Sequence, residues 1–226
     1  FIKKGEENKV CRLKKSLYGL KQAPRAWYSR INGYFLKNGF QKCPFEHTLY
    51  VKEGVNNSVL VVSLYVDDLI IAGSNVEDIN TFKENMEKEF EMTDLGLLHF
   101  FLGMEIKQSN GGFFISQQKY AKELLKKFKM ENANSVSTPV AVGLKLSKED
   151  DTELIDPTLF RSLVGNLMYL TATRPDIAYG VSLISRFMEC PRMSHWEAGK
   201  RILRYIRGTL SDGIYYQKAV SYTHLR

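Results

Sequence analysis

The stretch from residue 60 to residue 72 constrains the fold of this 226-residue chain most, because two adjacent aspartates interrupt a long apolar run. Apolar, mostly β-branched residues stand on both sides of Asp67 and Asp68, which predicts the two strands of a buried hairpin. Asp-Asp is a poor choice for a two-residue turn, which normally uses Asn-Gly or Asp-Gly. Two neighbouring carboxylates also repel each other unless a cation neutralises them. Asp67-Asp68 is therefore either an acidic turn on a solvent-facing hairpin or a turn that holds a divalent cation, with Mg²⁺ as the first candidate.

The composition favours a globular protein with a polyanionic partner. Hydrophobic residues make up 44% of the chain and aromatic residues 12%, enough for one large or two small cores. Lys and Arg exceed Asp and Glu by 32 to 25, a net charge of +7 that suits nucleic acid without proving it. Three scattered cysteines argue against a disulfide framework, and no run has transmembrane length or the form of a signal peptide. Because the chain does not begin with Met, we expect it to be a piece of a longer protein.

A second informative segment runs from Leu17 to Tyr28. Pro24 suits the first turn of a helix, and the apolar spacing that follows predicts a helix over residues 24–38. A loop that leads into a helix N-terminus is a natural place for phosphate groups. Lys21 and Arg25 lie beside that loop, so the segment is a candidate phosphate-binding site.

Hydrophobic periodicity predicts strands and helices along the rest of the chain. We expect strands at 48–52, 58–66, 69–72, 99–106 and 113–115, and helices over 117–130 and from about 74, 156, 173 and 194 onwards. Ser74 with Glu77, and Ser194 with Glu197, have the spacing of capping boxes. Residues 131–155 lose the periodicity and are predicted to form a linker.

Several motifs resemble those of one known family. Leu-Tyr-Gly-Leu-Lys-Gln-Ala-Pro-Arg-Ala-Trp at 17–27 is similar to a segment of the reverse transcriptases of copia-type long-terminal-repeat retrotransposons. Tyr65-Val66-Asp67-Asp68 resembles the Y-x-D-D signature of reverse transcriptases. Residues 101–106 resemble the primer-grip region, and residues 160–177 resemble the connection between polymerase and ribonuclease H. The resemblance extends to about Tyr216.

The resemblance implies an α+β fold. It predicts a partial polymerase palm made of an antiparallel sheet with helices, followed by a thumb and a C-terminal helical connection subdomain. The expected boundaries are 1–112 for the palm with its primer-grip hairpin, 113–138 for the thumb-like segment, 139–156 for the linker, 157–217 for the connection and 218–226 for a foreign tail.

The resemblance also implies roles for individual residues. Asp67 and Asp68 would be catalytic and hold two Mg²⁺ ions, for which Mn²⁺ can substitute. The other implied contacts are with nucleotide, with primer and with the nucleic-acid backbone. The residues that would contact the nucleotide are Gln22, Ala23, Pro24, Tyr65 and Val66. Those that would contact the primer are Phe101, Leu102, Gly103, Met104 and Glu105. Those that would contact the nucleic-acid backbone are Lys21, Arg25, Lys119, Lys122 and Lys126.

The implied partners are an RNA or DNA template with its primer, deoxynucleoside triphosphates and the rest of the Pol polyprotein. That polyprotein would add integrase and the fingers and remaining palm upstream, and ribonuclease H downstream. The implied location is the cytoplasm, within virus-like particles, with nuclear passage and no membrane partner. A further essential aspartate is expected upstream, and nothing before Gln22 resembles it, since Glu6 and Glu7 lie in a polar stretch. We therefore predict that the isolated chain is inactive.

Two alternatives stay open from the sequence. The chain could be a relic or co-opted domain that binds nucleic acid without catalysis. The lysines of the helix at 117–130 could contact a nucleic-acid backbone or only form a solvated face. The same choice applies to Arg201, Arg204 and Arg207.

Overall fold

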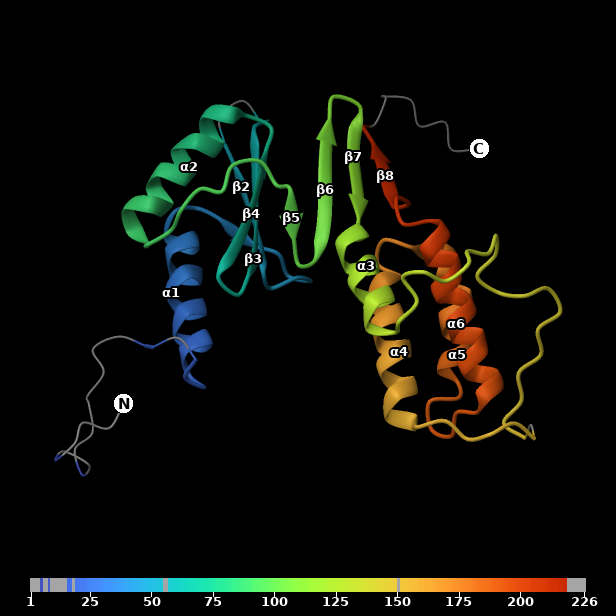
Figure 1. Ribbon diagram of the computed structural model, residues 1–226. Coiled ribbons are helices and arrows are strands. Elements are labelled where there is room, and N and C mark those ends of the chain that lie inside the picture. The colour runs from blue at the N-terminus through green and yellow to red at the C-terminus, as the bar shows by residue number, and fades with distance from the viewer. Residues whose placement is uncertain are drawn as a thin grey trace. The chain divides into compact units, whose positions relative to one another are not determined.

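The computed structural model describes residues 5, 8, 16–17, 19–54, 57–149 and 151–218, which form two compact units divided after Gly96. Each unit contains a four-stranded antiparallel sheet with helices beside it (Figure 1). The predicted α+β class is therefore confirmed. The predictions for Glu6, Glu7 and residues 219–226 fall outside the described residues.

In the first unit, the strands follow chain order across the sheet. They are β1 (Gln41–Lys42), β2 (Leu49–Glu53), β3 (Val59–Tyr65) and β4 (Asp68–Gly73). Helices α1 (Ala23–Lys37) and α2 (Val76–Glu89) pack against this sheet (Figure 1). The strands and the first helix predicted from periodicity are confirmed to within one or two residues.

Buried and less buried side chains alternate along β3, and this alternation shows which face of the sheet the helices cover. Leu60, Val62 and Leu64 are buried in the core with residues of α1 and α2, such as Phe35 and Phe82. The residues between them point to the opposite face. This second face is only partly buried along β3 and is exposed at the end of the strand.

One predicted helix start is wrong in detail. We expected Ser74 and Glu77 to form a capping box, but Asn75 is the N-cap of α2 and its side chain accepts from the Glu77 N–H. The Ser74 hydroxyl instead accepts a hydrogen bond from the backbone N–H of Val59 at 2.9 Å. Ser74 thus joins the end of the β4 segment to the start of β3.

The second unit has its own sheet, formed by segments distant in the sequence. Strands β5 (Phe100–Phe101), β6 (Met104–Ser109) and β7 (Gly112–Ser116) follow one another, and β8 (Ile214–Gln217) pairs with β7. The contacts place the β6–β7 hairpin in this unit, whereas we predicted a boundary at 112. The division after Gly96 differs from our prediction because the hairpin and the later helices belong to one body.

The helices of the second unit share one core. They are α3 (Gln118–Lys127), α4 (Pro157–Leu170), the 3₁₀ helix η2 (Pro175–Ile177), α5 (Ala178–Ser185) and α6 (Met193–Gly208). Leu124 and Leu125 of α3 belong to the same buried cluster as Leu163 of α4 and Ile202 of α6. The palm, thumb and connection roles of these segments stay predictions.

The predicted linker packs against α6 through arginine side chains. Arg204 Nε and Arg207 Nε donate to the backbone carbonyls of Asn134 and Glu131, each at 2.7 Å. Arg201 Nη2 donates to Thr138 Oγ1 at 2.9 Å. These arginines therefore bind the irregular segment of their own chain.

The start of α6 also differs from the prediction. Ser194 and Glu197 do not form its capping box, because the N-cap is Arg192 and its backbone N–H donates to His195 Nδ1 at 3.0 Å. His195 Nε2 lies 2.9 Å from the Ser147 carbonyl, and the ring stacks on Phe187. His195 is thus a buried histidine whose two ring nitrogens both have partners.

Among the described residues, no helix is both long and apolar enough to cross a membrane.

Candidate metal-binding turn and nucleic-acid contacts

The turn between β3 and β4 consists of Val66 and Asp67, because Tyr65 pairs with Asp68 in the sheet. We predicted Asp67-Asp68 as the turn, and this is wrong by one residue. The apolar pattern could not settle the point, since a register slip of two residues keeps the same side chains on the core face. Val66 has φ of 52°, which is unusual for a β-branched residue.

The two aspartates project from the turn and have no partner in the part of the chain that the structure describes. Asp68 pairs with Tyr65 and therefore lies on the sheet face opposite the core, while Asp67 lies at the tip. Both residues are exposed, and neither carboxylate has a hydrogen bond or ion pair with another described residue. Unpaired carboxylates on an open face can accept cations.

The donor chemistry fits Mg²⁺, but the ligand set is incomplete. Carboxylate oxygens are the ligands that Mg²⁺ prefers. Within the described residues, however, no group of three or more His, Cys, Asp or Glu side chains comes together as a metal site. Asp67 and Asp68 thus provide part of a Mg²⁺ ligand set.

Helix α1 contacts this turn directly. Trp27 Nε1 donates a hydrogen bond of 2.7 Å to the Val66 carbonyl. The sequence predicted Trp27 only as one residue of an apolar helix stripe, so this contact was missed. Nothing in the local pattern could reveal it, because the two residues are 39 positions apart.

The predicted nucleotide-binding residues lie at the start of α1. Gln22 is the N-cap residue and forms no side-chain cap bond, and Pro24 lies in the first turn. Lys21 and Arg25 are exposed and form no ion pair with described residues. The α1 N-terminus and the β3–β4 turn lie toward the same end of the first unit (Figure 1). The structure thus brings Gln22, Ala23 and Pro24 to the same end of the unit as Tyr65 and Val66.

The predicted primer-grip residues form a tight hairpin in the second unit. Leu102 and Gly103 are the two turn residues between β5 and β6, with φ of 48° and 79°. Positive φ at both positions is typical of a type I′ turn. The hydroxyl of Tyr169, in α4, donates to the Leu102 carbonyl, and a Cβ at Gly103 would collide with that hydroxyl. Only glycine fits this position without a shift of Tyr169.

Glu105 links the same hairpin to α3. Its Oε1 accepts from the backbone N–H of Lys119 at 2.6 Å, where a carboxylate is favoured by the helix dipole. Phe101 pairs with Met104 across the hairpin. Every predicted primer-grip residue therefore lies in one element that is bonded to α3 and α4.

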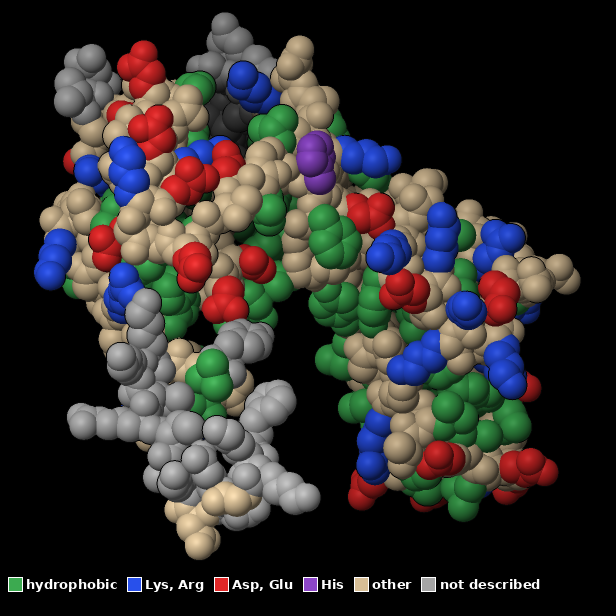
Figure 2. All heavy atoms as spheres, turned by 60° about the vertical axis from the view of Figure 1, so that its left-hand side comes forward, with side chains coloured by type: hydrophobic (Ala, Val, Ile, Leu, Met, Phe, Trp, Pro, Cys, Tyr) green, Lys and Arg blue, Asp and Glu red, His purple; other side chains and the backbone are tan. Residues whose placement is uncertain are grey.

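The lysines predicted to contact the nucleic-acid backbone line one side of α3. Lys119, Lys122 and Lys126 are exposed, while Ala121, Leu124 and Leu125 of the same helix are buried. These lysines form no ion pair with described residues. Over the visible face as a whole, basic and acidic side chains are mixed rather than gathered in one patch (Figure 2). The stripe on α3 is thus a local feature.

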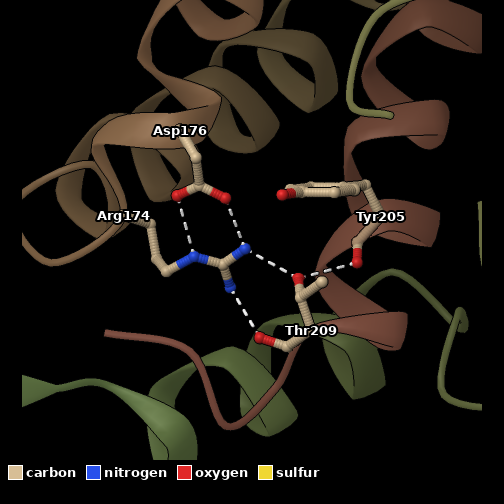
Figure 3. A network of polar contacts seen from close by, with 4 residues as sticks. All are labelled: Arg174, Asp176, Tyr205 and Thr209. Carbon is tan, nitrogen blue, oxygen red and sulfur yellow. Dashed lines mark hydrogen bonds and ion pairs between the residues drawn. The ribbon is translucent and has the colours of Figure 1, made fainter. Parts of the chain in front are cut away.

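A buried polar network joins η2 to the end of α6 (Figure 3). Arg174, only 3% exposed, donates to both carboxylate oxygens of Asp176 at 2.9 and 2.7 Å and to the carbonyl and hydroxyl of Thr209. Burial alone would raise the pKa of Asp176, but the hydrogen bonds from Arg174 and Tyr205 and the charge of Arg174 outweigh it and lower that pKa. Arg174 and Asp176 therefore have a structural role, because they bond η2 to the end of α6.

Comparisons with known proteins agree with these motifs. The family model described as "Reverse transcriptase (RNA-dependent DNA polymerase)" matches residues 1–142. The chain is 43% identical to the Retrovirus-related Pol polyprotein from transposon RE1 of Arabidopsis thaliana and 42% identical to that from transposon TNT 1-94 of Nicotiana tabacum. These alignments cover 96% and 92% of this chain.

The chain spans only a small part of those polyproteins, 15% of the RE1 protein and 16% of the TNT 1-94 protein. It is also 35% identical to a transposon Ty5-1 protein of Saccharomyces cerevisiae, over 96% of this chain and 71% of that protein. No solved structure gives a significant match.

Proposed function

Because this chain belongs to the reverse transcriptase family, in the type found in copia-like retrotransposon Pol polyproteins, we propose that it supplies the Asp67-Asp68 metal site of an RNA-dependent DNA polymerase. The observation that carries this proposal is the turn itself. It presents two exposed carboxylates, Asp68 on the open face of an antiparallel sheet and Asp67 at the tip of the turn, and neither has a partner among the described residues. It also lies against the helix whose N-terminus carries the second family motif.

The proposed chemistry is two-metal nucleotidyl transfer. When bound, Mg²⁺ would supply charge that lowers the pKa of the primer 3′-hydroxyl and stabilises the leaving pyrophosphate. Asp67 and Asp68 would hold the metal ions through their carboxylate oxygens. Gln22 at the start of α1 would face the nucleotide or template base, with Ala23, Pro24, Tyr65 and Val66 around it. Lys21 and Arg25 would contact phosphate groups.

The remaining ligand would come from another part of the polyprotein. Among the described strands, β4 pairs only with β3, so its outer edge is open at the point where Asp68 begins the strand. A strand added to this edge could place a further carboxylate beside Asp68. We propose that a preceding segment of the polyprotein supplies it, and that the 226-residue chain alone does not polymerise DNA.

A primer-extension assay tests this proposal. The purified chain and the longer polyprotein that carries it would each receive a primed RNA template, deoxynucleoside triphosphates and Mg²⁺. We expect Mg²⁺-dependent DNA synthesis by the polyprotein alone. Synthesis by the isolated chain would refute the proposed missing ligand, and an inactive but folded polyprotein would favour a relic.

The second unit supports an accompanying role in holding the primer and template. The hairpin with Phe101, Leu102, Gly103, Met104 and Glu105 would contact the primer, and Lys119, Lys122 and Lys126 would contact the nucleic-acid backbone. The exposed lysine stripe also favours the second candidate function, nucleic-acid binding without catalysis. In either case, we place the chain within a Pol polyprotein, with integrase and ribonuclease H as neighbours and virus-like particles as its site of action.

A further inference from the structure

The β3–β4 turn has an unusual backbone that needs an explanation. Val66 has φ of 52° and is 55% exposed, so no burial of its side chain favours this conformation. A β-branched residue populates the left-handed region rarely, because its Cβ approaches the backbone too closely. Such conformations persist only where neighbouring groups hold them.

The two-residue hairpin itself favours positive φ at Val66, and Trp27 adds a hydrogen bond that fixes the Val66 carbonyl. The Trp27 indole N–H donates to the Val66 carbonyl at 2.7 Å, which is a short bond for a neutral donor and acceptor. The carbonyl belongs to the peptide group that joins Val66 to Asp67. Its orientation therefore sets the direction in which the Asp67 backbone, and with it the carboxylate, leaves the turn.

Trp27 is itself held in place by the core of the first unit. Its ring packs edge-on against Phe90 at 5.4 Å between centroids, and Phe90 is buried and packs edge-on against Tyr34 at 5.3 Å. The donor is therefore positioned by α1 and by the residue that follows α2. The side chain of Trp27 thus connects the Val66–Asp67 peptide group to the core.

We propose that Trp27 is a positioning residue that holds the Val66–Asp67 peptide group so that Asp67 and Asp68 share one cation. This inference rests on the proposed function, since it concerns the same pair of carboxylates. In this proposal, Trp27 contacts the turn and not the cation. It acts by keeping the turn in the conformation that binds the cation. Loss of the hydrogen bond to Val66 therefore lowers the fraction of chains whose turn can bind the cation.

The test measures Mn²⁺ binding to the folded chain through paramagnetic broadening of the Asp67 and Asp68 amide signals in NMR spectra. Trp27→Phe keeps an aromatic ring against Phe90 but removes the N–H donor. We expect the apparent Mn²⁺ affinity to fall about fivefold, the factor that one ordinary hydrogen bond supplies. Trp196→Phe, the change of the other tryptophan in the second unit, should leave the affinity unchanged.

A second substitution separates positioning from general packing. Glycine adopts positive φ without strain, so Val66→Gly in the Trp27→Phe background should restore the affinity to within about twofold. A residue that only stabilised the core would not be rescued in this way. If Trp27→Phe unfolds the unit, replacing Trp27 by its benzothienyl analogue in the Trp196→Phe background removes the same donor with the ring shape kept.

The outcomes distinguish this inference from the proposed function. Unchanged Mn²⁺ affinity after loss of the donor, or failure of Val66→Gly to restore a lowered affinity, would refute the role of Trp27 alone. Unchanged affinity in the Asp67→Asn and Asp68→Asn double variant would refute the metal assignment itself, and the role of Trp27 with it.

Discussion

Val66 and Leu102 share a feature that is rare for apolar residues. Both have positive φ in a two-residue turn, and the carbonyl of each accepts a hydrogen bond from an aromatic side chain of a helix. The donors are Trp27 in the first unit and Tyr169 in the second. Both turns lie within motifs that resemble those of reverse transcriptases. Aromatic donors therefore stabilise unusual backbone at the two places where the family resemblance predicts contact with substrate.

At Asp176, a single substitution should change both stability and its dependence on pH. Asp176→Asn removes the carboxylate that is hydrogen-bonded to the buried Arg174 guanidinium, so we expect the second unit to lose about 1–2 kcal/mol of unfolding free energy at neutral pH. This figure is below that of a fully buried pair, because the Asp176 side chain is 36% exposed. Denaturant unfolding monitored by circular dichroism measures the loss.

The sign of the pH effect follows from the lowered pKa of Asp176. The contribution is fully present above the unfolded pKa of about 3.9 and is lost as the pH falls through the lower folded value. The difference between the original chain and Asp176→Asn should therefore shrink below about pH 4. The exposed Asp151→Asn is the matched control, and a difference that does not change with pH would contradict the assignment.

Among the elements, α3 carries the clearest prediction for nucleic-acid binding. Lys122→Gln with Lys126→Gln removes two exposed charges from one stripe, so the slope of log affinity against log salt should become shallower by about 1.8 on duplex and about 1.4 on single-stranded DNA. An electrophoretic shift assay at several salt concentrations, with single-stranded DNA and with a primed duplex, gives the slope. Lys145→Gln with Lys148→Gln changes the same charge on the irregular segment and should have little effect. Equal slopes for both double variants would contradict a backbone-contact role for α3.

Helices and strands were predictable from the sequence where a pattern of neighbouring residues determines them. The apolar spacing after Pro24 predicted α1 almost to its ends, and alternation predicted β2 and β3. The predicted N-cap residues of α2 and α6 were wrong. Several residues near the start of each helix could supply the cap, and tertiary contacts decided between them. Ser74 was bonded to β3 instead, and His195 took the capping role at α6.

The sequence names candidate site residues but not how they are arranged. Local motifs pointed to Asp67, Asp68 and Gln22. The contact of Trp27 with the turn, the bond from Lys119 to Glu105 and the division after Gly96 depend on residues distant in the sequence. The one-residue error in the turn has the same origin, because face alternation permits more than one register.

At the scale of the whole molecule, the chain consists of two units that each carry part of the proposed function. The first holds the aspartate turn and the predicted nucleotide-binding residues, and the second holds the predicted primer grip and the lysines of α3. The chain spans 15% of the RE1 polyprotein, and we propose that the complete reaction needs the rest of such a polyprotein. The two carboxylates that this chain contributes are the part that a single substitution can test.

The most direct measurement is Mg²⁺-dependent primer extension by the polyprotein that carries this segment, with Asp67→Asn and Asp68→Asn made separately. Each change removes a metal ligand while keeping the size of the side chain, so we expect DNA synthesis to fall at least about 100-fold. Glu87→Gln, which removes one exposed negative charge from α2 in the same unit, should keep full activity. DNA synthesis at the original rate in either aspartate variant would contradict the assignment of the Asp67-Asp68 turn as the polymerase metal site.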